Sequence, residues 1–451
     1  MTTEERYRYM TEEPVGKIIP VLAVPTIISM LVTSVYNMAD TYFVGKISTE
    51  AAAAVGVIFS LMAIIQALGF TIGMGSGNVI SRLLGKKDFE KAERVAAVAF
   101  VTAIIVGVLL AIFGLGNISW LVSVLGAIEA VKPYAESYAS YILIAAPVMM
   151  GSYVLNNLLR SQGSAVLSMV GIATGAVLNV ILDPIFIFAF DMGIAGAALA
   201  TILSQCISFC ILFSLVNFRK NGIHIKLSKF KPSPSIYGNI LHSGSPSLCR
   251  QGLASVAGVV TNNCAGAFGP AAIAALSIVN RITFVVFSVV IGFGQAFQPV
   301  CGFNYGAKKY DRVIKAYKVT LRISLSVLVV MAVLLFAFSG NVVEFMKKED
   351  ADIVAIGSKA LRFQCMTMPL QAFIIVSQFL TQSIGYGGRA SLIAMSRQGI
   401  FLIPAFLILT PMLGILGLQL AQPISDVLTF ILSFVIKIFV IKRLNELKEG
   451  F

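Results

Sequence analysis

The sequence predicts an all-α integral membrane protein whose twelve transmembrane helices form two pseudo-symmetric six-helix bundles, an N lobe and a C lobe. Three observations predict this fold: the composition, the length of the apolar segments and an internal repeat. Of the 451 residues, 57% are hydrophobic and only 12% are charged, about half the charged share of a soluble domain. The mean hydropathy is +0.89.

The apolar segments have the length of membrane-spanning helices. Most are about 20 to 27 residues long, and a helix rising 1.5 Å per residue needs about 20 to cross a hydrocarbon layer. Barrel strands would be shorter and alternating. The first 15 residues lack the basic-then-apolar order of a cleaved signal. The expected spans are 16–44, 51–74, 94–114, 134–158, 165–190, 194–218, 237–265, 272–299, 316–338, 360–383, 391–411 and 415–440.

The positive charge behind the net +13 is divided unequally between the two sides of the membrane. With the N-terminus inside, about 26 of the 34 Lys and Arg residues fall on inside segments and about 6 on outside segments. The positive-inside rule therefore predicts a multi-pass protein of the plasma (cytoplasmic) membrane with both termini in the cytoplasm. The basic charge is then explained by topology, which argues against a nucleic-acid partner.

An internal repeat divides the chain. The pairs Pro25 and Pro246, Gly45 and Gly266, Gly73 and Gly294, and Gly85 and Gly306 are each separated by 221 residues. We therefore expect an N-terminal lobe over 1–216, a cytoplasmic linker over 217–236 and a C-terminal lobe over 237–451. Because each half has an even number of spans, the halves should be related by an axis along the membrane normal, with the cleft of an alternating-access carrier between them.

Few charges are expected within the spans, and each is costly at membrane depth, at about 2.5 to 3.5 kcal/mol on insertion scales. These residues are Asp40, Asp183, Arg250, Arg281 and Asp426. Each therefore needs a partner or a function.

Four polar residues of the first half are expected at one depth. Asn179 and Asp183 are four residues apart and share a helix face, and Thr201 in the next span returns to the same level. Asp40 also lies in the outer half of its span. Two carboxylates, an amide and a hydroxyl could hold Na⁺ or exchange protons. In the alternative interpretation, Asp183 satisfies backbone groups that Pro184 frees.

The second half lacks this acidic set, since Thr261 stands where the repeat has Asp40. Arg250 or Arg281 could pair with Asp426, or the arginines could line the cleft for an anionic or zwitterionic substrate, and the sequence leaves both open. Walker A and C-x-x-C motifs are absent from the sequence, so we expect no cofactor beyond a coupling ion and no enzyme. Met150 suits a permissive cavity, although ordinary core packing is the alternative.

Five motifs are distinctive: the loops "LLGKKDFEKA" and "NYGAKKYDRV", and the segments "LRSQGSAVLSM", "LNVILDPIFIF" and "GIAGAALATILSQ". Together they resemble the multidrug and toxic compound extrusion (MATE) family, in particular its MepA-type branch. The resemblance covers essentially the whole chain. It implies a secondary active antiporter that exports amphipathic, mainly cationic organic compounds in exchange for H⁺ or Na⁺.

The resemblance also implies site residues. The cation site corresponds to Asp40, Asn179, Asp183 and Thr201. Tyr138 and Asn156 correspond to a tyrosine and an amide that line the cavity in the family. From the residues themselves, Tyr36, Met150 and Arg281 are further candidates for the substrate cavity. The seventh and tenth spans offer Arg250, Gln251, Gln364 and Gln371 but no acid, which departs from relatives with a second Na⁺ site. The expected partners are small-molecule substrates and the lipid bilayer, for a monomeric protein.

Two alternative functions stay open: an exporter of an anionic metabolite, and a lipid-linked flippase of the same superfamily. A facilitator-superfamily porter would need an Asp-Arg pair in the loop after the second span, and "SRLLGKKD" lacks it.

Overall fold

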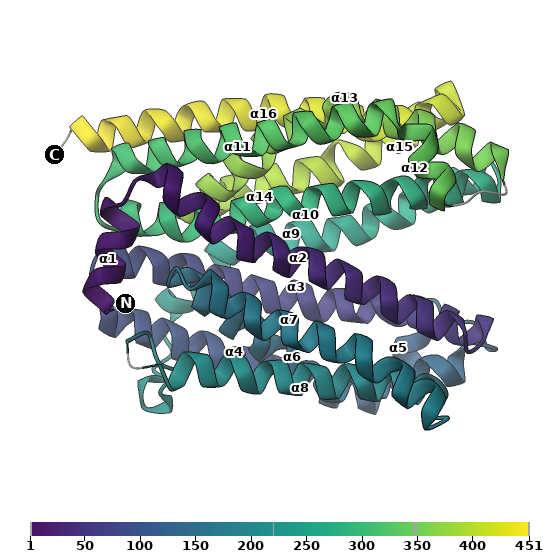
Figure 1. Ribbon diagram of the computed structural model, residues 1–451, viewed down its shortest axis with the longest axis horizontal. Coiled ribbons are helices and arrows are strands. Elements are labelled where there is room, and N and C mark those ends of the chain that lie inside the picture. Colours follow the sequence, from purple (N-terminus) through teal and green to yellow (C-terminus); the bar gives the residue numbers. More distant parts are fainter. Residues whose placement is uncertain (1, 220, 347–349, 450–451) are drawn as a thin grey trace.

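The protein is two bundles of long helices that meet at one end. The computed structural model describes residues 2–219, 221–346 and 350–449, and within these ranges the regular structure is helical, with no strand. Lys220, Lys347 and Lys348, which enter the charge count above, lie outside the described residues. Figure 1 shows the bundles together at the end that carries the short helix α1 and diverging toward the other end. We call these the α1 end and the far end.

The helices fall where the apolar segments predict them. In the N lobe they are α2 (Val15–Gly45), α3 (Thr49–Gly85), α4 (Phe89–Gly116), α6 (Lys132–Ser161), α7 (Ala165–Pro184) with the π-helix η1 (Ile185–Ala189), and α8 (Gly193–Asn217). In the C lobe they are α9 (Pro234–Gly266), α10 (Pro270–Gly306), α11 (Tyr310–Ala337), α13 (Ala351–Ser383), α14 (Gly387–Met395) with the π-helix η3 (Ser396–Ile400) and α15 (Leu402–Leu413), and α16 (Ile415–Glu449). Shorter elements are α1 (Thr3–Glu12), α5 (Ile118–Val124), η2 (Leu227–Lys229) and α12 (Ser339–Met346).

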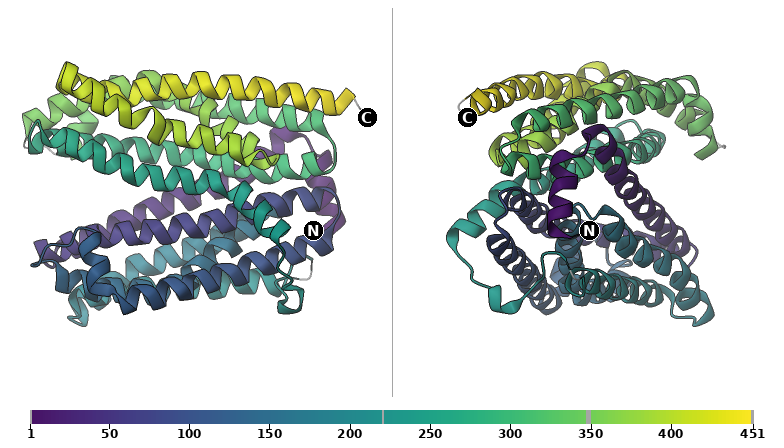
Figure 2. Two further views of the ribbon diagram at one scale, coloured as in Figure 1. Left: turned by 180° about the vertical axis from the view of Figure 1, so that it is seen from behind. Right: turned by 60° about the vertical axis from the view of Figure 1, so that its left-hand side comes forward.

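Eleven of the twelve expected spans are long and apolar enough to cross a membrane in the described part of the chain. The exception is α9, which is a 33-residue helix but is rich in Ser and Gly and carries His242 and Arg250. It lies alongside the other long helices (Figure 2). Helix α9 packs on α3 of the other lobe, and its Ser247 donates to Met74 of that helix.

The second span is longer than the sequence predicts. The expected end near residue 74 is wrong, since α3 continues through Gly73, Gly75 and Gly77 to Gly85. A Cβ on Gly75 would lie 2.2 Å from the Ile240 carbonyl oxygen of α9. These glycines let helices approach closely, which is their common use in membrane proteins.

The two lobes also meet at a pair of repeat-related glycines. A Cβ on Gly85 would lie 2.1 Å from the carbonyl oxygen of Phe303, and one on Gly306 would lie 2.1 Å from that of Arg82. Each hypothetical Cβ also comes within 3.1 Å of the other glycine's Cα. Because equivalent residues of a two-fold repeat touch only near its axis, the pseudo-two-fold axis passes between Gly85 and Gly306.

Helix α1 bridges the lobes at this end. It begins with a capping box between Thr2 and Glu5. Its Arg6 donates to Gln162 Oε1 of the N lobe at 3.3 Å, and its Met10 carbonyl accepts from Asn304 Nδ2 of the C lobe at 2.9 Å. Burial, and then the charge of Arg219, lower the pKa of Arg6 to about 10, which leaves it cationic at neutral pH. The sequence signalled neither this helix nor its contacts.

Candidate functional site

Three residues of the predicted cation site are in direct contact. Asn179 and Asp183 lie on one face of α7, and Thr201 lies on the facing side of α8. Asn179 Nδ2 donates to Asp183 Oδ1 at 3.3 Å and to Thr201 Oγ1 at 3.2 Å. The three side chains are at most 2% exposed. The helices approach closely because Gly175 leaves space for the Ser208 side chain of α8.

Asp40 adds a second carboxylate from α2. Helix α2 packs against α7. Asp40 lies near the C-terminal end of α2 and is 8% exposed. The charges of Asp40 and Asp183 are close enough to interact. Tyr138, fully buried on α6, lies near both Asp40 and Thr201. The structure therefore brings Asp40 to the other three residues, as the shared depth predicts, and adds a tyrosine.

This cluster has oxygen atoms without partners. Asp40 Oδ1, Asn179 Oδ1, Asp183 Oδ2 and the Tyr138 hydroxyl are buried and accept no hydrogen bond from any described residue. Among the described contacts, no Lys or Arg side chain pairs with either carboxylate. Buried polar atoms normally have partners. Unfilled oxygens around two acids are the ligands that a proton or Na⁺ would satisfy.

Pro184 follows Asp183 at the end of α7. The chain continues as the π-helix η1, whose last turn closes with the Phe190 amide donating to the Ile185 carbonyl at 3.0 Å. In the described residues Asp183 receives its hydrogen bond from the Asn179 side chain and none from the backbone. The geometry thus gives no support to the alternative in which the acid caps groups freed by the proline.

Of the predicted substrate-cavity residues, Tyr36 and Tyr138 lie beside Asp40, whereas no described contact joins Asn156 or Arg281 to the cation cluster. Tyr36 lies one turn before Asp40 on α2 and interacts with it electrostatically. Met150 is fully buried in α6. Asn156 points away from the cation cluster and donates to Ser168 Oγ at 2.5 Å. Arg281 is exposed on α10 of the C lobe, and none of its described contacts reaches the N-lobe cluster.

The C lobe contains a different polar cluster around Asp426. The expectation that Asp426 pairs with Arg250 or Arg281 is wrong, because its partner is Arg397. Arg397 Nε donates to Asp426 Oδ1 at 3.1 Å and Gln371 Nε2 to Oδ2 at 2.5 Å. Gln422 Nε2 also donates to Oδ1, at 3.1 Å. In the count of charges by membrane side, Arg397 is one of the inside residues. In the structure it lies in the π-helix η3, ten residues after Gly387, where this span begins.

Two further arginines lie between the lobes, Arg160 buried and Arg82 partly buried, and sequence reasoning did not identify their role. Arg160 donates to Gln295 of the C lobe and to Asn157, and Arg82 donates to the Ser383 carbonyl at 2.8 Å. A small polar cavity is lined by residues of both lobes there: Met74, Gly77, Asn78, Ser81, Asn157, Arg160, Ser161, Gln295, Gln298 and Pro299. Both arginines follow the ends of predicted spans, so the sequence predicts solvated charges at these positions. The contacts hold the α1 end closed.

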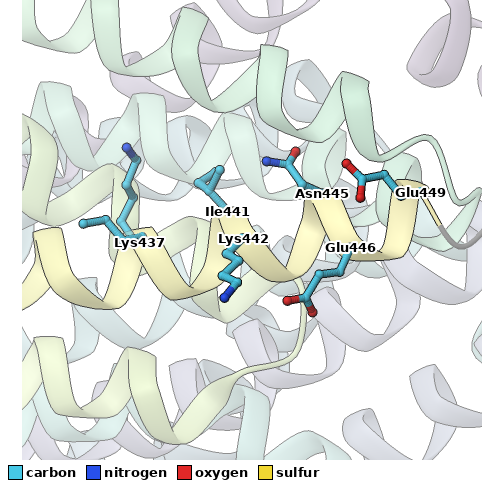
Figure 3. Close-up of a pocket in the computed structure, with 7 residues that line it drawn as sticks. Lys437, Ile441, Lys442, Asn445, Glu446 and Glu449 are labelled. Carbon is cyan, nitrogen blue, oxygen red and sulfur yellow. The ribbon is translucent and has the colours of Figure 1, made fainter.

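A surface pocket on α16 lies away from both clusters. Figure 3 shows it lined by Lys437, Ile441, Lys442, Asn445, Glu446 and Glu449. These charged side chains belong to the solvated end of the helix, so we do not assign a functional site to this pocket.

The family model of MatE matches residues 25–185 and 246–407, one segment in each lobe. The chain belongs to the MATE family. Both matched segments contain residues of the polar clusters, since the first includes Asp40, Asn179 and Asp183 and the second includes Arg250 and Arg397. MATE proteins are transporters, which confirms the expectation of a membrane transporter rather than an enzyme.

Individual MATE relatives match the whole chain. The multidrug export protein MepA of Staphylococcus aureus is 28% identical over 99% of this chain and 100% of its own. MepA of Staphylococcus saprophyticus is 26% identical over the same shares. Among solved structures, a MATE in the bent conformation superposes with a TM-score of 0.92 at 27% identity, covering 99% of each chain.

A further solved structure bears on polarity. It is a transporter of the same superfamily from Pyrococcus furiosus, described as having a binding pocket of reverse polarity that suggests a different function. It superposes with a TM-score of 0.91 at 28% identity and covers 97% of this chain and 98% of its own. The similarity confirms the MATE fold for this chain.

Proposed function

We propose that this MATE protein is a secondary active antiporter that exports amphipathic organic compounds in exchange for H⁺ or Na⁺ bound in the N lobe. One observation carries the proposal: Asp40 and Asp183 are buried together without a basic partner, and each retains an oxygen that forms no hydrogen bond with a described residue. The export direction follows the multidrug export proteins MepA that the chain resembles.

The cluster can couple a cation to movement through charge. When both carboxylates are ionised, their repulsion in a medium of low dielectric constant separates α2 from α7. A proton or Na⁺ cancels that repulsion and lets the unfilled oxygens of Asn179 and Tyr138 close around the site. Because α2 contacts α10 of the C lobe as well as α7, a shift of α2 on α7 is transmitted to the contact between the lobes.

The same proposal fixes the orientation. We place the α1 end in the cytoplasm, because the basic segments 86–94, 221–231 and 308–322 lie at this end, and positively charged segments face the cytoplasm. The described conformation, closed at the α1 end, is then the one that opens outward. The membrane is the cytoplasmic membrane, and one chain carries both lobes, so a monomer suffices.

The test uses proteoliposomes loaded with a fluorescent cationic dye and given a pH gradient or a Na⁺ gradient, one at a time. We expect one of the two gradients to drive dye movement and Asp183→Asn to abolish it. Asp191→Asn is the matched control, since this exposed acid lies eight residues further along and should leave transport unchanged. Full gradient-driven transport in Asp183→Asn would disprove the coupling role.

A further inference from the structure

Arg250 lies where the two lobes begin to separate. One turn before it on α9, Ser247 Oγ donates to Met74 Sδ of α3 at 3.1 Å, and a Cβ on Gly244 would lie 2.0 Å from the Thr71 carbonyl oxygen. Figures 1 and 2 show the bundles diverging from the α1 end toward the far end. Arg250 is half-buried near the middle of α9, and its guanidinium points into the C lobe over the ring of Phe379.

The positive charge of Arg250 is not compensated. Asp426, the acid in the interior of this lobe, is already bound by Arg397, Gln371 and Gln422. Arg250 forms no hydrogen bond or ion pair with any side chain in the described ranges, and Arg397 adds a second positive charge nearby. The interior of the C lobe therefore holds two guanidiniums and one carboxylate, a net charge of +1.

Packing alone does not account for this side chain. The guanidinium carbon lies 5.9 Å from the Phe379 ring centroid, near the outer limit of about 6 Å for a cation–π contact. A charge at membrane depth is costly on every insertion scale. An apolar residue would fill the space without that cost. The remaining role for an unpaired, partly accessible guanidinium is to bind an anion.

We propose that Arg250 is the specificity-determining residue of the C lobe and binds an acidic group of the exported compound. The substrate class is then an amphipathic molecule that carries a carboxylate, as a zwitterion or an anion. A guanidinium suits this group because its paired N–H donors match the two carboxylate oxygens. The inference rests on the proposed efflux function, in which the coupling cation occupies Asp40 and Asp183.

The test compares two rhodamine dyes that share one fluorophore: a zwitterion with a free carboxylate and the cation in which this carboxylate is an ethyl ester. Binding to the purified protein in detergent is measured by fluorescence anisotropy. We expect the free-acid dye to bind about tenfold more tightly than the ester. Arg250→Gln should remove this difference without weakening the ester, and Arg250→Lys should retain part of it.

Two controls separate binding from folding. Arg8→Gln removes an exposed arginine of α1 that has no described partner and should change neither affinity. Arg250→Met keeps the side-chain bulk, and it should behave like Arg250→Gln while the Tm of the protein is maintained. The inference fails if the ester binds as tightly as the free acid, if neither dye binds, or if Arg250→Gln weakens both equally.

Transport of the same dyes distinguishes this inference from the proposed function. If proteoliposomes export the ester but not the free acid, antiport stands and the role of Arg250 is wrong. If neither gradient moves either dye while the free acid still binds through Arg250, the antiport proposal fails and the anion site stands.

Discussion

The interiors of the two lobes are built from equivalent helices but carry opposite charge. In the N lobe, α2 and α7 contribute Asp40 and Asp183, and two of their carboxylate oxygens have no described partner. In the C lobe, α9 and η3 contribute Arg250 and Arg397, and the carboxylate of Asp426 is fully hydrogen-bonded. Duplication therefore preserved the helix arrangement while the polar chemistry diverged. The N-lobe cluster keeps carboxylate oxygens without described hydrogen bonds, whereas the Asp426 carboxylate is held on both oxygens by its neighbours.

The largest expected effect tests whether the Asp426 cluster is structural. Asp426→Ala leaves Arg397 buried without its acid, which typically costs about 3 to 5 kcal/mol. We expect a large fall in the Tm of the purified protein. The double variant Arg397→Met/Asp426→Leu should recover most of the loss, because it removes both charges together. An unchanged Tm in Asp426→Ala would show that Asp426 is no more tied to its neighbours than Asp40 and Asp183 are.

The contact between Gly85 and Gly306 tests whether the lobes remain equivalent away from their polar interiors. Because each Cβ would lie 2.1 Å from a carbonyl oxygen of the other lobe, Gly85→Ala and Gly306→Ala should each cost about 1 to 3 kcal/mol. Both should open the α1 end and expose the buried Cys301 to a maleimide. Unequal labelling rates in the two variants would place the axis elsewhere.

A smaller effect is expected at Thr201 and its repeat partner Gln422. Thr201→Val removes the hydroxyl that accepts from Asn179, and a lost hydrogen bond is worth about 1 kcal/mol. We expect the coupling cation to bind about fivefold more weakly, measured from the ion dependence of dye efflux. Gln422→Leu should lower the Tm but leave that dependence unchanged. A shift in ion dependence for Gln422→Leu would assign the C lobe a share in coupling.

The smallest change is expected for the stability of Tyr138→Phe. The Tyr138 hydroxyl lies near Asp40 and Thr201 but is not in hydrogen-bonding geometry with a described residue, so its removal should leave the Tm within the error of the measurement. If the hydroxyl helps to hold the cation, the ion dependence of efflux will nevertheless shift. A pronounced loss of Tm would instead identify Tyr138 as a structural partner of Asp40.

The sequence predicts the N-lobe site better than the C-lobe cluster, for a physical reason. Asn179 and Asp183 share a face by helical periodicity, and Thr201 follows after a short turn, so local spacing and depth suffice. The pairing of Asp426 with Arg397 depends on the depth in the membrane at which the π-helix η3 holds Arg397. The contacts of Arg82 and Arg160 depend on how two distant lobes meet. Hydropathy located the twelve helices but missed α1, whose role is also set by the contact between lobes.

The contact of Gly85 with Gly306 also bears on how such a chain could arise. A residue on a two-fold axis touches its own copy, so in a homodimer of six-helix chains this position would have been one glycine facing itself. An even number of spans returns the chain to the side on which it started, so a second copy fused behind the first keeps the same orientation in the membrane. Fusion of the two genes would then have required only a connector at the α1 end, where residues 218–233 now join α8 to α9. Once fused, the two interiors were free to acquire opposite charges, which identical subunits could not have done.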